Sequence, residues 1–192
     1  PDQNRDFATI AFSALTADIP EDMEPSLEEM ATYDPANFTF PNSAHICMVE
    51  LDKDTCEVKI THYTAVDDVG SIINPLVVEG QVQGGIVQGV GQALLEHGVY
   101  DDNGQLLSGT MLDYAMPRAD NMPMTNLANT VTPSPHNPLG VKGAGEMGTI
   151  AATVTVANAV MDALAPAGIT HLDMPLTAQK LHAALNSNGG GD

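Results

Sequence analysis

The glycine-rich segment at residues 140–149 holds the residue types in this chain that are best suited to chemistry. It reads GVKGAGEMGT and places one acid, Glu146, among four glycines, directly before a run of small residues that predicts a helix from about Thr149. Glycine allows a backbone to approach a ligand closely, and the free N–H groups at a helix start attract anions. The pattern therefore favours a carboxylate placed for acid–base work beside a bound cofactor. An acid that only interacts favourably with the helix dipole is the alternative, and it leaves the four glycines unexplained.

A second unusual segment is a predicted helix over residues 75–97, which is rich in glycine. Residues 80–92 read GQVQGGIVQGVGQ, and each interior glycine costs roughly 0.5–1 kcal/mol relative to alanine. Close approach of another backbone or of a ligand would offset that cost. Gln81, Gln88 and Gln92 project from similar faces, and their amides suit oxo groups or the edge of a heterocycle. Tight helix packing with solvated glutamines is the simpler alternative.

Two other binding patterns are disfavoured. Residues 143–148 read GAGEMG, a literal G-x-G-x-x-G, with Asp173 as a downstream acid. A dinucleotide site requires a buried strand directly before the first glycine, but residues 133–139 read PSPHNPL, and proline removes the donors of a central strand. The six histidines lack paired spacing, so no protein-ligated metal is predicted. Asp67 and Asp68 are interpreted as solvated or capping acids at a strand end.

The composition indicates a folded, acidic protein without a basic binding surface. The 192 residues are 43% hydrophobic, which is enough for one domain with a sizeable core. The formal net charge of −19 argues against a nucleic-acid or anionic-membrane partner. We expect no membrane span, because no apolar stretch approaches the roughly 20 residues required. Cys47 and Cys56 lack disulfide-framework or metal spacing and are predicted to be reduced thiols of a cytoplasmic protein.

The expected elements mix strands and helices without regular βαβ alternation, so the predicted fold class is α+β. Strict alternation along residues 58–66 predicts the second strand of a hairpin over residues 45–66. Its turn is expected at residues 52–55, with Cys47 opposite a residue near Ile60. Asn103 and Gly104 predict a second hairpin, and residues 123–138 are expected to form a proline-rich loop.

Three more helices are expected beside the glycine-rich one. The first follows a capping Asp6, and the last follows a capping Thr177. The helix between them ends near a capping Gly168. Its apolar face is predicted from residues at helical spacing, which are Ile150, Val154, Ala157, Met161 and Leu164.

The predicted organisation has three parts. Residues 1–42 comprise a partial helix and an acidic, proline-containing connecting segment, residues 43–186 form the main domain, and residues 187–192 form a flexible tail. A structureless segment as long as residues 16–42 is uncommon inside a compact domain. We therefore expect the chain to be a fragment of a larger subunit.

Several motifs occur in a distinctive order. They are AVDDVG at 65–70 with INP at 73–75, EGQ at 79–81 with GIVQGVG at 85–91, and TPSPHNPLGVKGAGE at 132–146. In order and spacing they resemble the C-terminal part of the large, molybdenum-binding subunit of the xanthine dehydrogenase family of molybdenum hydroxylases. The resemblance is strongest to the aerobic carbon monoxide dehydrogenase type and runs from about residue 8 to residue 185. It makes residues 43–186 a molybdopterin-binding domain.

The resemblance implies roles for individual residues. Glu146 corresponds to the family glutamate that acts as general base on a hydroxyl bound to molybdenum, and Gln88 to a glutamine near the oxo group of the metal. The backbone that approaches the pterin and the metal corresponds to Lys142, Gly143, Ala144 and Gly145. Val69 stands where many members of the carbon monoxide type have cysteine, and Cys56 replaces a turn glycine; neither departure touches this chemistry.

The resemblance also implies a cofactor, partners and a substrate. The cofactor is molybdenum bound by molybdopterin cytosine dinucleotide, and electrons pass to iron–sulfur and FAD subunits. The N-terminal remainder of the same subunit supplies further cofactor contacts, so the isolated chain is expected to bind cofactor poorly and to be inactive. The expected small-molecule substrate is carbon monoxide, oxidised to carbon dioxide, with an aldehyde or an N-heterocycle as alternatives. A non-catalytic assembly domain is the alternative from another class.

Overall fold

The computed structural model describes residues 4–16, 19, 21, 24–28 and 30–188. The chain divides into two units, Pro1–Pro35 and Ala36–Asp192. The first unit contains helix α1 (Phe7–Thr16), which buries none of its residues. The Asp6 carboxylate accepts a hydrogen bond from the Thr9 N–H at 2.6 Å, which confirms the predicted cap. The described residues between α1 and Asn42 belong to no helix or strand, as predicted.

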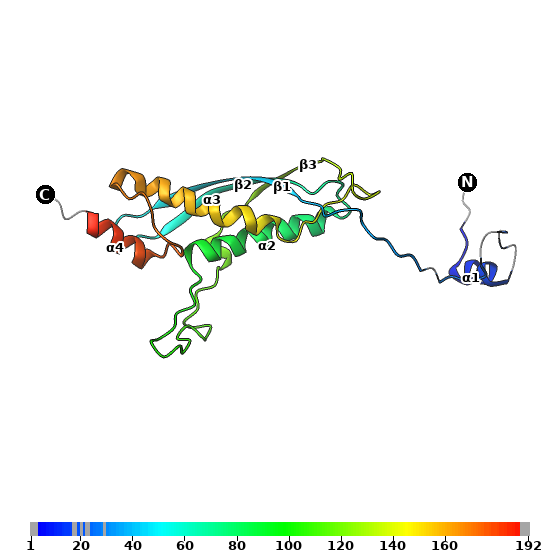
Figure 1. Ribbon diagram of the computed structural model, residues 1–192, viewed down its shortest axis with the longest axis horizontal. Coiled ribbons are helices and arrows are strands. Elements are labelled where there is room, and N and C mark those ends of the chain that lie inside the picture. The colour runs from blue at the N-terminus through cyan, green and yellow to red at the C-terminus, as the bar shows by residue number, and fades with distance from the viewer. Residues whose placement is uncertain (1–3, 17–18, 20, 22–23, 29, 189–192) are drawn as a thin grey trace. The chain divides into compact units, whose positions relative to one another are not determined.

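The second unit is built on a three-stranded sheet in the order β1-β2-β3 (Figure 1). Strands β1 (Asn42–Leu51) and β2 (Val58–Asp68) form the predicted antiparallel hairpin. Strand β3 (Asn126–Thr130) pairs in parallel with the end of β2, inside the stretch predicted to be a proline-rich loop. That prediction was wrong because NLANT has little intrinsic strand character, and the strand forms through its pairing with β2.

The hairpin contains a register shift that alternation along β2 does not reveal. Cys47 pairs with Tyr63, whereas Ile60 pairs with Val49, so the predicted pairing of Cys47 near Ile60 was wrong. The shift lies between Met48 and Val49 and moves the buried face of β2 from Ile60 to the odd-numbered residues that follow. The prediction that buried and exposed side chains alternate strictly through residues 58–66 was therefore also wrong.

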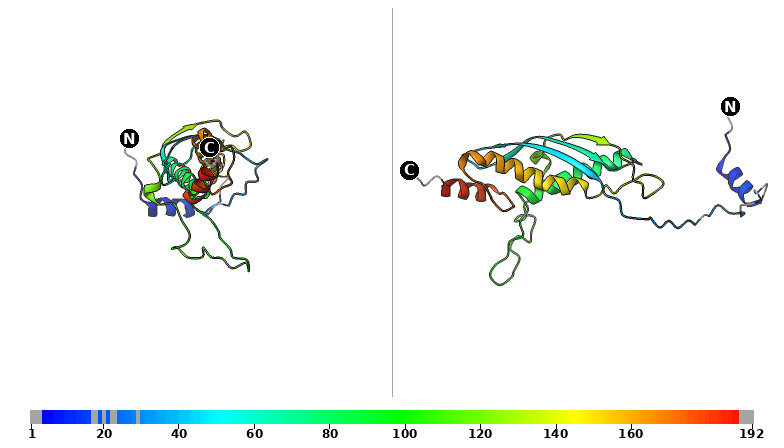
Figure 2. Two further views of the ribbon diagram at one scale, coloured as in Figure 1. Left: turned by 90° about the vertical axis from the view of Figure 1, so that its left-hand side faces the viewer. Right: turned by 45° about the horizontal axis from the view of Figure 1, so that its top comes forward.

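Two helices run side by side, and the second of them packs against β1 of the sheet (Figures 1 and 2). They are α2 (Pro75–Leu94), capped by Asn74, and α3 (Met147–Leu164). A Cβ atom added to Gly85 would lie 2.8 Å from the Thr149 nitrogen, and one added to Gly89 would lie 2.6 Å from the Ala152 Cβ. These two glycines therefore offset their conformational cost by letting the helix backbones approach, which confirms tight packing as their role.

The core face of α3 matches the predicted one only in part, because Leu164 is buried and Ala157 and Met161 pack against the core, as predicted. Ile150 and Val154 are 68% and 55% exposed, so their assignment to the core was wrong. At the close approach to α2 the helix places the small residues Gly148 and Ala152, and Ile150 and Val154 lie outside. The buried residues of α3 are Met147, Gly148, Ala152, Thr153, Val156, Val160 and Leu164.

The helical stretch Met147–Ala167 also corrects the expectation about apolar length. Its 21 residues are long and apolar enough to suit a membrane span by length and composition alone. The buried face of α3, however, packs against α2 and the sheet. We therefore assign this helix to the protein core.

The remaining elements are short or peripheral. The second hairpin is reduced to a single bridge between Tyr100 and Leu106, within a loop that extends away from the sheet and helices (Figure 1). Turn η1 (Ala119–Asn121) precedes β3, and η2 (Ala165–Ala167) is ended by Gly168 in the left-handed conformation, as predicted. Helix α4 (Ala178–Asn188) follows Thr177 and extends two residues into the segment predicted to be a tail.

Candidate functional site

The first part of the glycine-rich loop is fixed to the residues that follow β2. The Gly140 carbonyl accepts the Ser71 N–H at 2.9 Å, and the Lys142 N–H donates to the Val69 carbonyl at 2.8 Å. Gly70 and Gly140 have φ angles of 67° and 65°, and a side chain on Gly70 would collide with the Gly140 carbonyl. Residues 140–142 are thus anchored by backbone hydrogen bonds and by glycines that cannot be replaced without strain.

A buried carboxylate reinforces this anchor. Oδ1 of Asp68 accepts hydrogen bonds from the Gly70 N–H at 2.9 Å and from the Lys142 ammonium at 3.0 Å. Its Oδ2 accepts the Thr130 hydroxyl at 3.3 Å. The side chains of Lys142 and Asp68 are 9% and 6% exposed. Hydrogen bonds, first from the Thr132 hydroxyl and then from Gly70 and Lys142, hold the pKa of Asp68 well below its usual range against the opposing effect of burial.

Glu146 occupies the N-cap position of α3, which begins two residues earlier than predicted. Its side chain makes no capping hydrogen bond, whereas its carbonyl accepts the N–H groups of Thr149 and Ile150. The carboxylate is exposed, and no salt bridge found within the described ranges involves it. Two residues later, a Cβ on Gly148 would lie 2.5 Å from the Val82 carbonyl oxygen of α2. Glu146 therefore presents an exposed carboxylate, without an ion-pair partner among the described residues, next to the tightly packed start of α3.

Residues 143–145 connect these two fixed points and leave their backbone accessible. Gly143 and Gly145 are exposed, and a Cβ on Gly143 would have nothing within 4 Å. Ala144 packs partly against the core. The Gln81 amide oxygen lies 4.0 Å from the position that a Cβ on Gly145 would take. The structure thus places open backbone beside the amide of Gln81.

The glutamines of α2 differ in their surroundings. Gln81 is the one that lies next to the glycine-rich loop, although the resemblance had singled out Gln88. Gln88 is exposed about two turns further along α2, and its cofactor contact stays a prediction. The Gln92 amide oxygen accepts the Thr153 hydroxyl at 3.3 Å. The sequence had indicated Gln81 only as one of three glutamines, with Gln88 and Gln92, that project from similar faces of the helix.

A buried polar network lies on the hairpin next to Asp68. His45 contacts the Asp67 carboxylate through Nε2 at 3.3 Å and the Tyr63 hydroxyl through Nδ1 at 2.8 Å. Ser43 donates to the same Asp67 oxygen at 2.6 Å. Burial raises the pKa of Tyr63 far above its usual value, so its hydroxyl stays protonated and can donate to His45. The register shift in β1 and β2 explains why sequence spacing did not identify this network.

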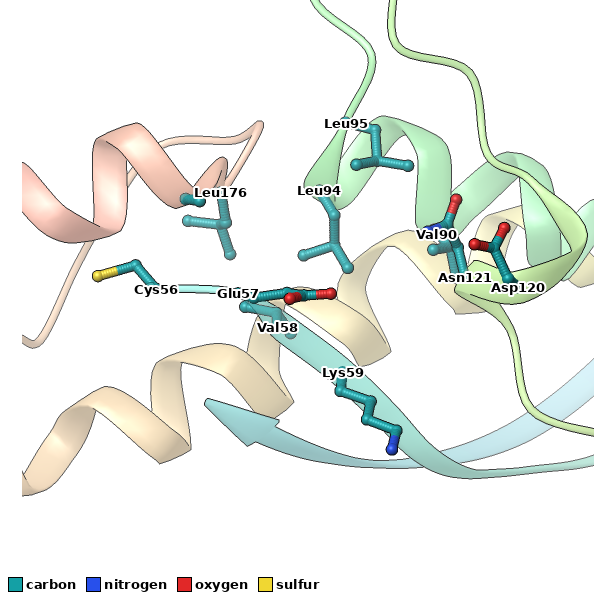
Figure 3. A pocket seen from close by; sticks show the side chains of 11 residues that line it. Cys56, Glu57, Val58, Lys59, Val90, Leu94, Leu95, Asp120, Asn121 and Leu176 are labelled. Atoms are coloured by element: carbon teal, nitrogen blue, oxygen red, sulfur yellow. The ribbon is translucent and has the colours of Figure 1, made fainter. Parts of the chain in front are cut away.

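Other candidate sites do not involve the glycine-rich loop. No group of three or more His, Cys, Asp or Glu suited to a metal occurs within residues 4–16, 19, 21, 24–28 and 30–188. A hollow of about 180 Å³ lies between the hairpin turn, the last turns of α2 and Leu176, and Figure 3 shows the side chains that line it. Its lining includes Val90 and Leu94, at the opposite end of α2 from Gln81. This hollow is therefore separate from the surface around Glu146.

The comparison with protein families defines the class of this protein. Residues 2–123 match the molybdopterin cofactor-binding domain, and the chain belongs to this family. The matched range includes α2 with Gln81 and Gln88, and it ends before the loop that carries Glu146.

Individual relatives of the chain are large subunits of known enzymes. The carbon monoxide dehydrogenase large chain of Hydrogenophaga pseudoflava is 41% identical over 169 residues, which cover 88% of this chain and 21% of that protein. The nicotine 6-hydroxylase large subunit of Paenarthrobacter nicotinovorans is 43% identical over 162 residues, which cover 84% and 20%. The crystal structure of quinoline 2-oxidoreductase from Pseudomonas putida 86 matches with a TM-score of 0.86 and 40% identity, over 94% of this chain and 23% of that one.

These matches confirm the predicted resemblance to molybdenum hydroxylase large subunits and the α+β fold class. The chain spans about a fifth of the length of the relatives it matches.

Proposed function

We propose that this chain is part of the large subunit of a molybdenum-dependent hydroxylase, with Glu146 as its general base. The observation that carries the proposal is the free, exposed carboxylate of Glu146 at the end of an anchored, open-backboned loop. When bound, the molybdenum cofactor supplies two-electron oxidation of the substrate. Glu146 accepts the proton released from the attacking oxygen, which requires the carboxylate to be ionised at the working pH.

The residues present fit an anionic pterin cofactor. The backbone at Gly143 and Gly145 is open, so a ligand can approach its N–H groups without meeting a side chain. Backbone N–H groups and a helix start bind anions locally, and the net charge of −19 does not remove that property. Gly143, Ala144 and Gly145 would border the cofactor through their backbone, Lys142 would anchor this segment, and Gln88 would reach the cofactor from α2.

The relatives support three candidate substrate classes. Carbon monoxide is the first candidate, because a carbon monoxide dehydrogenase large chain is 41% identical over 88% of this chain. An N-heterocycle is the second, because a nicotine 6-hydroxylase large subunit is 43% identical over 84% of it. An aldehyde is the third, as in the aldehyde oxidoreductase of Desulfovibrio gigas, a solved structure with 26% identity and a TM-score of 0.67. Turnover of each substrate by the full-length enzyme separates the three.

The cofactor form, partners and compartment belong to the same proposal. The cofactor is the cytosine dinucleotide form of molybdopterin, the remainder of the subunit completes its site, and iron–sulfur and FAD subunits receive the electrons in the cytoplasm. The relatives are named as large chains or large subunits, which supports partner subunits. Molybdenum analysis of the full-length subunit, with detection of CMP after acid hydrolysis, tests the cofactor assignment; absence of molybdenum contradicts it.

The base assignment is tested by Glu146→Gln in the full-length enzyme. We expect kcat to fall by about 10²–10⁴-fold, as is typical for loss of a general base, while the molybdenum content stays unchanged. Glu50→Gln removes an exposed carboxylate from β1 and serves as the matched control. A non-catalytic assembly domain, which the exposed apolar residues Leu76 and Leu112 would suit, predicts full activity for both variants.

A further inference from the structure

The lysine of the glycine-rich loop is directed into the protein. Lysine and arginine together number six in this chain, yet the Lys142 side chain is only 9% exposed. Its ammonium lies 3.0 Å from Oδ1 of Asp68, a residue 74 positions earlier in the sequence. Its backbone N–H also points inward, to the Val69 carbonyl at 2.8 Å. Both groups through which Lys142 could donate to a ligand are therefore engaged with the strand end.

The Asp68 carboxylate joins three segments of the chain. It receives the N–H of Gly70 just after β2, the hydroxyl of Thr130 at the end of β3, and the ammonium of Lys142 from the loop. A carboxylate with several charge-assisted and neutral donors holds a fixed orientation, because each bond restricts it in a different direction.

The distance along the chain from this junction to Glu146 is short. Residues 143–145 separate Lys142 from Glu146, and Gly148 then fits closely against Val82 and Gly85 of α2. Four Cα–Cα steps, at roughly 3.3–3.6 Å each, limit the distance from Lys142 to Glu146 to about 13–14 Å, so the two residues stay close to one another. A shift of the Lys142 end would therefore displace the carboxylate of Glu146.

From this arrangement we infer that Asp68 is a positioning residue, which acts through Lys142 to hold the loop that carries Glu146. We call the ion pair between Lys142 and Asp68 the tether. The lysine ammonium binds Asp68 in this tether and does not bind the cofactor. The inference rests on the proposed function, because it concerns the placement of the proposed base. A displacement of about 1 Å at a reacting group can reduce turnover by about 100-fold, so a positioning role has a measurable kinetic consequence.

The test uses the full-length holoenzyme and compares Asp68→Asn, Lys142→Met and the double variant. We expect each single variant to keep its molybdenum, to lose between about 10-fold and 100-fold in kcat per molybdenum, and to change KM by less than about threefold. The double variant should be no worse than the more impaired single variant, because either change releases the same tether. Asp173→Asn is the matched control, since its pair with His171 is exposed, and its kcat should stay within about twofold of wild type.

Each alternative result has a distinct meaning. Loss of molybdenum in Lys142→Met but not in Asp68→Asn would show that the ammonium binds the cofactor, which overturns the tether. Unchanged kcat per molybdenum in both variants, with only a lower thermal midpoint, would show a purely structural ion pair and would also overturn it. A wild-type enzyme without molybdenum, or full activity of Glu146→Gln, would instead refute the proposed function.

If Asp68→Asn does not accumulate as a folded protein, the comparison of Lys142→Arg with Lys142→Met tests the same inference. Lys142→Arg keeps a cation with hydrogen-bond donors opposite Asp68, so its kcat should be well above that of Lys142→Met. Equal loss of kcat in the arginine and methionine variants would contradict the tether.

Discussion

Gly140 and Gly143, in the two parts of the glycine-rich loop, lie three residues apart in sequence but differ in burial and in their contacts. Gly140 is buried, has a φ of 65° and accepts hydrogen bonds from Ser71 and Ser134 through its carbonyl. Gly143 is exposed, and a Cβ added there would meet nothing within 4 Å. The difference teaches that glycine has two uses in one motif: one builds the fold, and the other leaves backbone free for a ligand.

Helix α2 repeats this contrast. Gly85 and Gly89 meet the backbone and Cβ atoms of α3, whereas Gly80 and Gly84 have open space where a Cβ would be. The anchored set, with Gly140 and Gly148, is expected to control stability. Substitutions in the open set, which also includes Gly143, are expected to cause no loss of stability, because no neighbouring atom occupies the place of a Cβ.

The largest effect on stability is expected from Gly148→Ala. The added Cβ would lie 2.5 Å from the Val82 carbonyl and force α2 and α3 apart, at a cost of about 1–3 kcal/mol. Gly84→Ala, on the open face of α2, should instead stabilise the chain by up to about 1 kcal/mol through helix propensity. Urea denaturation of the two variants measures both changes. If the urea midpoint of Gly148→Ala equalled that of wild type, the expectation that the anchored glycines control stability would be wrong.

A second pair of variants compares the two glycines of the loop. Gly140→Ala must accept a positive φ and a Cβ 2.8 Å from that of Pro133, which should cost about 1–2 kcal/mol. Gly143→Ala should change stability by less than about 0.5 kcal/mol. In the full-length enzyme, Gly143→Ala should nevertheless lower the molybdenum content if the backbone meets the pterin. Normal content in that variant would argue against the approach of the cofactor at this residue.

Acid should weaken the anchored part specifically. The pKa of Asp68 is lower in the folded chain than its ordinary value of about 3.9, so its contribution to stability is present above that pH and is lost as the pH falls towards the folded pKa. Asp68→Asn should lack this part of the acid dependence. Urea midpoints of wild type and Asp68→Asn, measured at about pH 7 and about pH 3, should therefore converge in acid. A constant gap between them would show that Asp68 does not contribute through its charge.

The smallest effect concerns a thiol on β1. Burial raises the pKa of Cys47 to about 11, so at pH 8 roughly one molecule in a thousand carries the reactive thiolate. Alkylation of the folded chain by iodoacetamide, followed by mass spectrometry, should be correspondingly slow at Cys47 and fast after denaturation. Rapid labelling of the native chain would show that this part of the sheet opens readily.

The sequence predicted several elements correctly because their signals are local. Asp6 caps α1 through its own carboxylate, and Asn103 and Gly104 lie in a turn closed by the Tyr100–Leu106 bridge. Strand β3 was missed because its residues have little strand propensity and depend on β2 for pairing. The core face of α3 was mispredicted at Ile150 and Val154 because helical spacing of apolar residues does not reveal where α2 approaches and small residues are required.

The candidate site shows the same division. The glycines around Glu146 and the open backbone beside it were visible as a spacing of residue types, and the structure brings residues 142–146 together at the start of α3. The pairing of Lys142 with Asp68 was not visible, because nothing in the local sequence relates residues 74 positions apart. The choice of Gln81 next to the loop likewise depends on how far α2 is displaced along α3.

By itself, the sequence determined which backbone segments are able to bend, cap and approach a ligand, since those properties belong to glycine, asparagine and acidic residues wherever they occur. The tertiary structure alone decided which of those segments are occupied by other parts of the protein and which remain open. That decision depends on helix-to-helix distance and strand register, and both are set by contacts between residues far apart in the chain.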